Sequence, residues 1–257
     1  MNEMDGRLQF AASLVEEAGR VALQHFRNRD NISAQAKAPM DFVSAADTEV
    51  EMFIRRRVND VWPGEALVGE ELGGEGGSSF WIVDPIDGTA NFLRGSPLWG
   101  VALAFVRDGE PCVGAINFPV LGMTLVAGLG CGAYVNGSPL ERSVPFPDVR
   151  LATICSNRQW SGPEPMTLEA QMKRHEWAVT NYRCATIGLG FAALGYTDGY
   201  FERQTSMWDL AAGVVICREV GLEVAFGGEQ MKQGMWVGVA SPNLKEAIWP
   251  FWLAIVS

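Results

Sequence analysis

The hydrophobic period of the chain changes near residue 61, and this change limits the possible folds more than any single motif. Before it, apolar residues recur at the spacing of an α-helix. The spacing predicts one helix over about residues 4–27 and a second over about 46–61, with a polar loop over 28–40 between them. Ser44 is expected to cap the second helix, and Asp47 three residues later would complete a capping box.

Short strands dominate the middle of the chain. Residues 66–71 and 80–88 have the pattern of buried strands that end in acidic turns, and residues 100–140 that of a β-meander. Asn136-Gly137 inside the meander is a strong signal for a tight hairpin. Further strands are predicted over 151–155, 177–182, 222–226 and 235–240, and further helices over 166–175, 188–194, 208–221 and from Ser241-Pro242 onward.

The order of these elements predicts an α+β protein built of stacked layers. Strands and helices do not alternate strictly, so a Rossmann-type sheet is not expected. A chain of 257 residues is long enough for one large domain. We therefore expect a single domain over 1–257, with an N-terminal part over about 1–150 that holds two helices and the meander, and an α/β C-terminal part over about 151–257.

Charge and cysteine content argue against several classes of function. With 20 Lys and Arg against 30 Asp and Glu, the net charge of −10 would repel nucleic acid, so no nucleic-acid partner is expected. Five cysteines without a CxxC pair and only two histidines argue against a Cys/His zinc site and for reduced thiols in the cytoplasm. No signal peptide is visible, and the apolar stretch near the end is too short to cross a bilayer, so no membrane partner is expected.

Three acidic clusters stand out among the predicted turns. Asp84 and Asp87 lie in WIVDPIDGT, where a proline follows an apolar strand and should turn Asp87 back toward Asp84. Glu70-Glu71 ends the preceding strand, and Asp209 opens a late helix. Converging carboxylates repel each other, and a hard cation such as Mg²⁺, which binds carboxylate and carbonyl oxygens, offsets that repulsion. The carbonyl of Ile86 would be a further ligand.

Each cluster taken alone has a simpler interpretation. The Asp-Pro-x-Asp-Gly pattern consists of turn residues, Glu70-Glu71 could be a solvated pair, and Asp209 could be an ordinary helix cap. The presence of all three in one chain favours a metal site over three unrelated turns.

Together these segments resemble the inositol monophosphatase family of Mg²⁺-dependent, lithium-sensitive phosphatases. GEE at 69–71, WIVDPIDGTANF at 81–92 and WDLAAG at 208–213 match the family in order and spacing, as does DFVSAADTEVE at 41–51. The resemblance covers the chain from roughly Lys37 to Gly221. It implies a layered αβαβα sandwich, usually a homodimer, with two or three Mg²⁺ ions in the active site.

The resemblance also implies roles for single residues. Thr89 would orient the attacking water with Asp47 behind it, and Glu70 would be both a catalytic residue and a metal ligand. The complete set of metal ligands would be Glu70, Asp84, the Ile86 carbonyl, Asp87 and Asp209.

The resemblance also implies which residues contact the substrate. Gly88 and Thr89 would offer backbone N–H groups to the phosphate, and Glu202 would accept hydrogen bonds from sugar hydroxyls, unless it is an exposed residue at a strand end. Ala185-Thr186 stands where the family usually has Gly-Ser or Gly-Thr, and residues 157–172 match no known segment. The full set implied to contact substrate is Ile86, Asp87, Gly88, Thr89, Ala185, Thr186, Glu202 and Asp209.

The expected activity is that of an inositol-1-monophosphatase, in which water attacks the phosphorus in line and metal ions neutralise charge. Histidinol phosphate, fructose 1,6-bisphosphate and phosphoadenosine phosphate are alternative substrates within the same superfamily. In each case the partner is a small phosphate monoester, most often of a sugar or polyol.

Two functions from other classes compete with this prediction. Gly188-Leu189-Gly190 followed by Ala193 fits the GxGxxA pattern of an NAD-binding dehydrogenase. Against it, Asp209 opens a helix, whereas that pattern needs an acidic residue at the end of a second strand. A catalytically idle phosphosugar- or metal-binding module is the other alternative, although Asp47, Thr89 and the ligand set are all intact.

Overall fold

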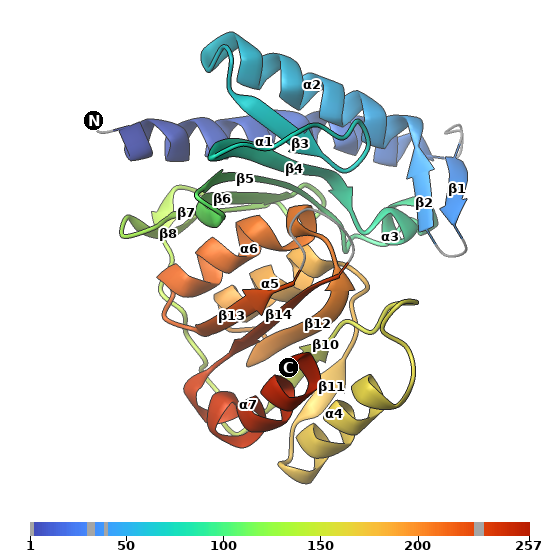
Figure 1. The fold of residues 1–257 in the computed structure, drawn as a ribbon, viewed down its shortest axis with the longest axis vertical. Helices are drawn as coiled ribbons and strands as arrows, with labels where there is room; N and C mark the ends of the chain where they lie inside the picture. Colours follow the sequence, from blue (N-terminus) through green and yellow to red (C-terminus); the bar gives the residue numbers. More distant parts are fainter. Residues whose placement is uncertain (1–2, 30–33, 39–40, 229–233) are drawn as a thin grey trace.

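Two β-sheets alternate with three layers of helices (Figure 1). The computed structural model describes residues 3–29, 34–38, 41–228 and 234–257. The layers follow one another as helices, sheet, helices, sheet, helices. This order confirms the αβαβα sandwich that the sequence resemblance implied.

The first half of the chain forms the first helical layer and a seven-stranded sheet. Helices α1 (Glu3–Arg27) and α2 (Ala45–Val61) pack on one face of this sheet. Its first two strands are parallel, and all later neighbours are antiparallel, so the predicted meander is confirmed. In spatial order the strands are β3 (Ala66–Gly69), β4 (Ser79–Asp87), β5 (Gly100–Arg107), β6 (Glu110–Phe118), β7 (Met123–Gly128), β8 (Gly132–Val135) and β9 (Ser138–Pro139).

The second half of the chain forms the remaining three layers. Helices α5 (Ala185–Leu194) and α6 (Met207–Glu219) lie between the two sheets, and α4 (Pro163–Arg174) and α7 (Pro242–Val256) cover the outer face of the second one (Figure 1). The second sheet has five strands in the spatial order β11 (Ala178–Thr180), β10 (Leu151–Ile154), β12 (Gly199–Thr205), β14 (Met235–Ala240) and β13 (Glu223–Gly227).

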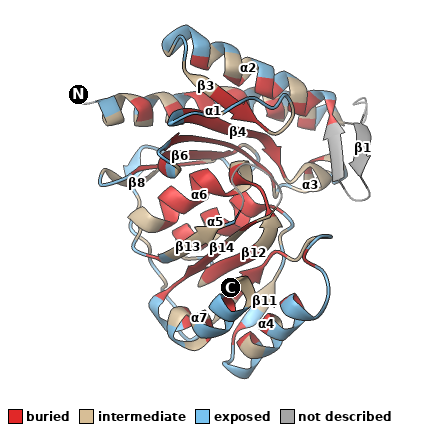
Figure 2. Ribbon diagram, viewed as in Figure 1, coloured by how far each residue is buried: buried red, intermediate tan, exposed pale blue. Residues whose placement is uncertain are grey.

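Helix α6 is the centre of the molecule. It contacts strands of both sheets, and most of its residues are buried (Figure 2), while Asp209, Arg218 and Glu219 are partly exposed. Gly114 of β6 allows it to approach closely, since a Cβ there would lie 2.3 Å from the carbonyl oxygen of Ala212. This packing fixes the start of α6 against the end of β4, which determines where the acidic residues of the two elements meet.

Local predictions hold at several turns and caps. Ser44 caps α2, and the capping box with Asp47 is present. Ser241 precedes α7 with Pro242 in its first turn. The positive φ angles of Asn136 (49°) and Gly137 (78°) match the predicted tight hairpin.

Other predictions are wrong. Residues 34–38 do not form a loop: β1 (Ala34–Ala38) pairs antiparallel with β2 (Asp41–Ser44) in a two-stranded ribbon. The segment AQAKA contains no β-branched or aromatic residue, so propensity gave no strand signal. Helices α4 and α5 each start three residues earlier than predicted. The six-residue helix α3 (Thr89–Arg94) and strand β12 were missed, because α3 is too short to show a period and β12 contains the polar run Glu-Arg-Gln.

Within the described ranges, none of the helices combines the length and the apolar character that a membrane span requires.

Candidate active site

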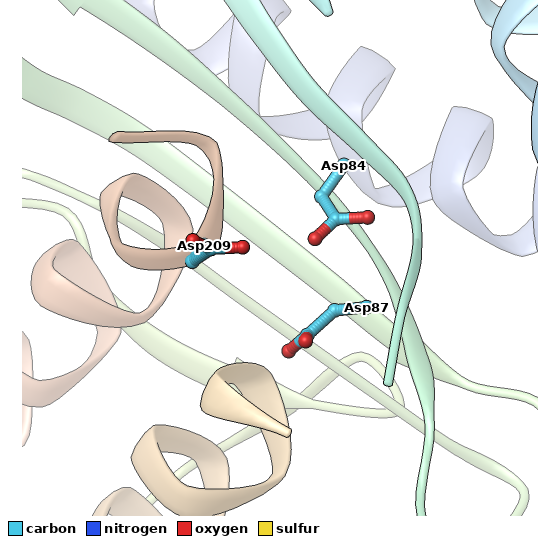
Figure 3. Close-up of side chains that lie close together, drawn as sticks. All are labelled: Asp84, Asp87 and Asp209. Atoms are coloured by element: carbon cyan, nitrogen blue, oxygen red, sulfur yellow. The ribbon is translucent and has the colours of Figure 1, made fainter. Parts of the chain in front are cut away.

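Three aspartate carboxylates meet between the seven-stranded sheet and helix α6 (Figure 3). One oxygen each of Asp84, Asp87 and Asp209 lies within 4.8 Å of the other two. Asp84 and Asp87 come from the end of β4, and Asp209 comes from the first turn of α6. The predicted turn of Asp87 toward Asp84 is therefore present, and a third carboxylate from the other half of the chain joins them.

A β-bulge in β4 brings the first two aspartates to one side of the strand. Asp84 lies opposite Ala102 of β5. Asp87 lies opposite Gly100, so three steps along β4 correspond to two along β5. Residues three apart on a regular strand point to opposite faces, and the extra residue removes that difference. The backbone N–H of Ile86 also donates a 3.1 Å hydrogen bond to Oδ1 of Asp84 and thereby orients this carboxylate.

The N-terminal cap of α6 holds Asp209 in position. Its Oδ2 accepts hydrogen bonds from the hydroxyl of Thr205 (2.7 Å) and the backbone N–H of Ser206 (2.9 Å). Ser206 is the N-cap residue and Asp209, three residues later, completes a capping box, so the simpler interpretation of Asp209 holds in the sense that it is part of the cap. It does not compete with a role in the cluster, because the same cap directs the carboxylate toward Asp84 and Asp87 (Figure 3).

The cluster is electrostatically unfavourable without a cation. Burial raises the pKa of Asp84 well above its ordinary value, and repulsion from Glu70, Asp87 and Asp209 adds to the effect. Burial, followed by repulsion from Asp87, raises the pKa of Asp209 to about 6. Burial likewise raises the pKa of Asp87, although a hydrogen bond from the Thr186 N–H opposes the shift.

The donor set fits a hard divalent cation. Carboxylate oxygens come from Asp84, Asp87 and Asp209. Repulsion from Glu70 is among the causes that raise the Asp84 pKa, but Glu70 is not one of the three residues whose oxygens lie within 4.8 Å of one another. The peptide group of Ile86 lies between two of these aspartates in the chain. Oxygen-only sites of this kind bind Mg²⁺, Mn²⁺ or Ca²⁺ rather than metals that prefer sulfur or imidazole.

A buried glutamate of α2 organises the turn that carries Glu70. Glu51 has no exposed surface, and its two oxygens accept hydrogen bonds from the backbone N–H groups of Glu71 (2.8 Å) and Leu72 (3.1 Å). Nε of Arg55 donates a third at 2.8 Å. Sequence reasoning missed Glu51, although an acidic residue beside the apolar face of a helix was a usable signal.

Thr89 and Asp47 form a second polar group beside the cluster. The Thr89 hydroxyl lies 3.3 Å from Oδ1 of Asp47 and 3.1 Å from the carbonyl oxygen of Ile86, so it can donate to either. Oδ2 of Asp47 accepts from the backbone N–H (2.9 Å) and hydroxyl (2.6 Å) of Ser44. Gly88 precedes Thr89 with a φ of 86°, a conformation that favours glycine.

The start of α5 contacts the cluster through Asp87. The backbone N–H of Thr186 donates a 2.5 Å hydrogen bond to Oδ2 of Asp87, and the thiol of Cys184 donates to the same oxygen at 3.2 Å. Ala185 lines the adjacent pocket, whereas Thr186 is fully buried with its hydroxyl 3.3 Å from Cys184 Sγ. Of the predicted pair, Ala185 thus faces the pocket and Thr186 supports Asp87. Cys184 was not predicted.

Glu202 lies in this same pocket, which has a volume of about 140 Å³ and is also lined by Asp87 and Asp209. The interpretation of Glu202 as an exposed residue is wrong, since only 5% of its surface is accessible. Its carboxylate accepts hydrogen bonds from Tyr200 Oη (2.6 Å) and Asn157 Nδ2 (3.3 Å). Burial, followed by repulsion from Asp209, raises its pKa to about 8. Asn157 opens the segment that the sequence left unassigned.

The pattern that suggested a dinucleotide-binding loop lies inside helix α5. Gly188 packs against the ring of Tyr200, where a Cβ would come within 2.2 Å, and Gly190 packs against Phe118. Both glycines are buried and permit close packing of the helix. They do not form a phosphate-binding turn after a strand, so the dehydrogenase prediction is wrong.

Both the sequence and the fold of this chain are similar to those of known proteins. A family model described as "Inositol monophosphatase family" matches residues 3–250. A histidinol-phosphatase of Chlorobaculum parvum is 32% identical and covers 83% of each chain. An inositol-1-monophosphatase of Rhizobium meliloti is 31% identical over 88% of this chain and 89% of the relative. The crystal structure of the extragenic suppressor protein suhB from Bartonella henselae shares the fold, with a TM-score of 0.85 at 23% identity over 96% of this chain and 98% of that one.

Proposed function

The chain belongs to the inositol monophosphatase family of phosphoric monoester hydrolases, and from that premise we propose that it hydrolyses a polyol or sugar phosphate with Mg²⁺ as cofactor. Inositol 1-phosphate is the substrate that we expect first. The observation that carries the proposal is the meeting of Asp84, Asp87 and Asp209 beside the Thr89–Asp47 pair, and two of these aspartates, Asp87 and Asp209, line a pocket.

The metal ligands in this proposal are the carboxylates of the cluster and one peptide oxygen. When bound, two or three Mg²⁺ ions would supply the positive charge that hydrolysis of a phosphate dianion needs and would make water more acidic. The proposed ligands are Glu70, Asp84, the Ile86 carbonyl, Asp87 and Asp209.

Thr89 and Asp47 act on the attacking water in this proposal. The Thr89 hydroxyl donates to Oδ1 of Asp47, which leaves its own oxygen lone pairs to accept a hydrogen bond from water. Ser44 holds the other oxygen of Asp47, so the carboxylate cannot rotate away. The water proton therefore has a path through Thr89 to Asp47. Glu70 completes the catalytic group in this proposal.

Substrate contacts follow from the same geometry. The backbone N–H groups of Gly88 and Thr89 would bind the phosphate, next to Ile86, Asp87 and Asp209. Ala185 and Glu202 line the pocket on the leaving-group side, and Thr186 acts through Asp87. Bound cations would favour the ionised form of Glu202, whose pKa is about 8 in the metal-free protein. In that form it would repel phosphate, so it is better suited to hydroxyls of the leaving group.

We extend the proposal to assembly and cellular location. We expect a homodimer, one domain with a division near residue 150, inhibition by Li⁺, and a cytoplasmic location. The unpaired state of all five cysteines is consistent with a reducing compartment.

A phosphate-release screen tests the proposal. Inositol 1-phosphate, histidinol phosphate, fructose 1,6-bisphosphate and phosphoadenosine phosphate are incubated with the protein, with and without Mg²⁺. We expect Mg²⁺-dependent release from inositol 1-phosphate. No release from any of the four would contradict the proposed activity, and faster release from histidinol phosphate would favour the activity for which the Chlorobaculum parvum relative is named.

A further inference from the structure

A single cation borders the acidic pocket. Among the described residues that line it, Arg183 alone carries a positive charge, while Asp87, Glu202 and Asp209 carry carboxylates. Arg183 is exposed, whereas Asp87 and Glu202 are buried, so the arginine stands at the solvent end of the pocket. The charges along the pocket are therefore arranged with acids inside and a cation outside.

The guanidinium of Arg183 has no protein partner within the described part of the chain. The backbone of Arg183, by contrast, is held in place: its N–H donates to Oδ1 of Asn181 at 2.9 Å. Arg203, which follows Glu202 in strand β12, is different: its Nη1 lies 2.8 Å from a carboxylate oxygen of Glu164. The charge of Arg203 is neutralised in this way, and that of Arg183 is available to a ligand.

The backbone places Arg183 in an uncommon conformation. Its φ of 54° lies in the left-handed region, which non-glycine residues rarely adopt. The side-chain amide of Asn181 stabilises this backbone conformation. Its Oδ1 accepts a hydrogen bond from the Arg183 N–H, and its Nδ2 donates one to Ser156 Oγ at 3.2 Å. The root of the side chain is thus fixed between the pocket and the start of α5.

A second pocket adjoins this one. Ser156 and Asn157 line both, and the second pocket has a volume of about 320 Å³ between helix α4 and strand β11. Arg183 lines the first pocket and not the second, so a leaving group would meet its charge within the pocket that also holds Glu202.

We propose that Arg183 binds a second anionic group on the leaving group, a carboxylate or a second phosphate, so that of two otherwise matched phosphate monoesters the protein prefers the one with the additional negative charge. This inference rests on the proposed phosphatase function and specifies its substrate class. A guanidinium matches the planar geometry of a carboxylate and can contact two phosphate oxygens at once. The same charge disfavours a leaving group that carries an ammonium, as histidinol phosphate does.

Matched pairs of substrates test the proposal. Glycerol 3-phosphate and 3-phosphoglycerate differ only in a hydroxymethyl against a carboxylate, and fructose 1-phosphate and fructose 1,6-bisphosphate differ in a distant phosphate. We expect the wild type to prefer the anionic member of at least one pair by on the order of ten-fold in kcat/KM, and Arg183→Gln to abolish that preference. Arg183→Lys should keep part of it, because the charge remains without the planar geometry.

Two controls separate charge recognition from a structural effect. Arg174→Gln removes the same charge from the exposed end of α4, away from the pocket, and should leave the preference intact. The preference should also shrink as salt is raised, because Arg183 is exposed to solvent. Equal kcat/KM within both pairs in the wild type, or an unchanged ratio in Arg183→Gln, would overturn the proposal.

A binding measurement keeps this test independent of turnover. The four esters are titrated calorimetrically into the wild type and Arg183→Gln, each carrying Thr89→Ala to suppress hydrolysis. Tighter binding of the anionic esters that depends on Arg183 supports the inference even when no ester is hydrolysed, in which case the proposed activity fails alone. Equal binding in both proteins rejects the role of Arg183, whatever the activity.

Discussion

The hydroxyl oxygen of Thr89 lies 3.3 Å from Oδ1 of Asp47. The two residues come from different helices, since Asp47 lies in the first turn of α2 and Thr89 is the first residue of α3. The other oxygen of Asp47 belongs to the capping box of α2. One side chain thus stabilises a helix end and receives the hydroxyl that we place next to the attacking water.

Removing the Thr89 hydroxyl should separate catalysis from metal binding. We expect Thr89→Ala to lower kcat about 10²- to 10³-fold, because the hydroxyl acts on the water in the transition state. The Kd for Mg²⁺ should stay near the wild-type value, since the hydroxyl is not among the proposed ligands. Steady-state kinetics and calorimetric Mg²⁺ titration measure the two quantities. Thr89→Ser, which keeps the hydroxyl, serves as the control, and near wild-type kcat in Thr89→Ala would remove the assigned role.

Mg²⁺ should stabilise the protein, and more strongly at higher pH. The pKa of Asp209 is raised from 3.8 to about 6 in the folded, metal-free protein. The folded state therefore binds more protons than the unfolded state over that interval, so this group costs stability as pH rises through it. Bound Mg²⁺ offsets the cost. At 100-fold excess over Kd the gain is about 2.7 kcal/mol.

Thermal unfolding at two pH values measures this effect. The gain corresponds to a Tm increase of roughly 5–10 °C for a chain of this size. We expect the increase near pH 8 to exceed that near pH 5, where protons compete with the cation. A chelator should reverse it and abolish activity. A Tm increase that is equal at both pH values would show that the stabilising cation does not bind at the aspartates.

Glu202 should matter for polyol esters and not for aryl phosphates. The pKa of Glu202 is about 8 in the metal-free protein, and bound cations nearby would favour its ionised form. Loss of a hydrogen bond to such a charged acceptor costs about 1.5–3 kcal/mol, which is roughly ten- to a hundred-fold in kcat/KM. We expect Glu202→Ala to lose this factor on inositol 1-phosphate. The rate on p-nitrophenyl phosphate should change little, because that leaving group has no hydroxyl to donate. Equal losses on both substrates would mean that Glu202 supports the fold or the metal ligands instead.

Glu51 should prove necessary for the turn that carries Glu70. Replacement by glutamine puts an amide group in place of an oxygen that accepts from a backbone N–H of Glu71 or Leu72. We expect a loss of about 1–3 kcal/mol in unfolding free energy and weaker Mg²⁺ binding, because Glu70 loses its support. Thermal unfolding and Mg²⁺ titration measure both. Glu49→Gln on the exposed side of α2 is the matched control, and unaltered Mg²⁺ affinity in Glu51→Gln would speak against a positioning role.

The acidic motifs predicted most of the site because each one coincides with an element boundary. Asp84 and Asp87 end a strand, and Asp209 and Asp47 begin helices, so local rules for strand ends and caps already located them. Asn157 could not be found in this way. It reaches Glu202 from a segment without a motif, and its role depends on tertiary packing alone.

The difference between local signals and tertiary packing also explains where the prediction of the fold was wrong. Long periodic segments such as α1 and the meander were predicted closely, because their burial pattern is strong and local. Strand β12 contains a charged residue that the strand buries, and only its place between β10 and β14 makes that burial possible. Cys184 contacts Asp87 across the two halves of the chain, a relation that spacing in sequence does not encode.

The position of α6 between the sheets has a consequence for how the protein folds. Asp84 and Asp87 lie in the first half of the chain. Their third partner, Asp209, lies at the start of α6, a helix that packs between both sheets. Such long-range closure is slow compared with local structure. The cation site should therefore be completed in the last phase of folding, and a refolding chain should gain its affinity for Mg²⁺ only when that phase ends. Metal uptake followed in time would then report on the docking of the two halves.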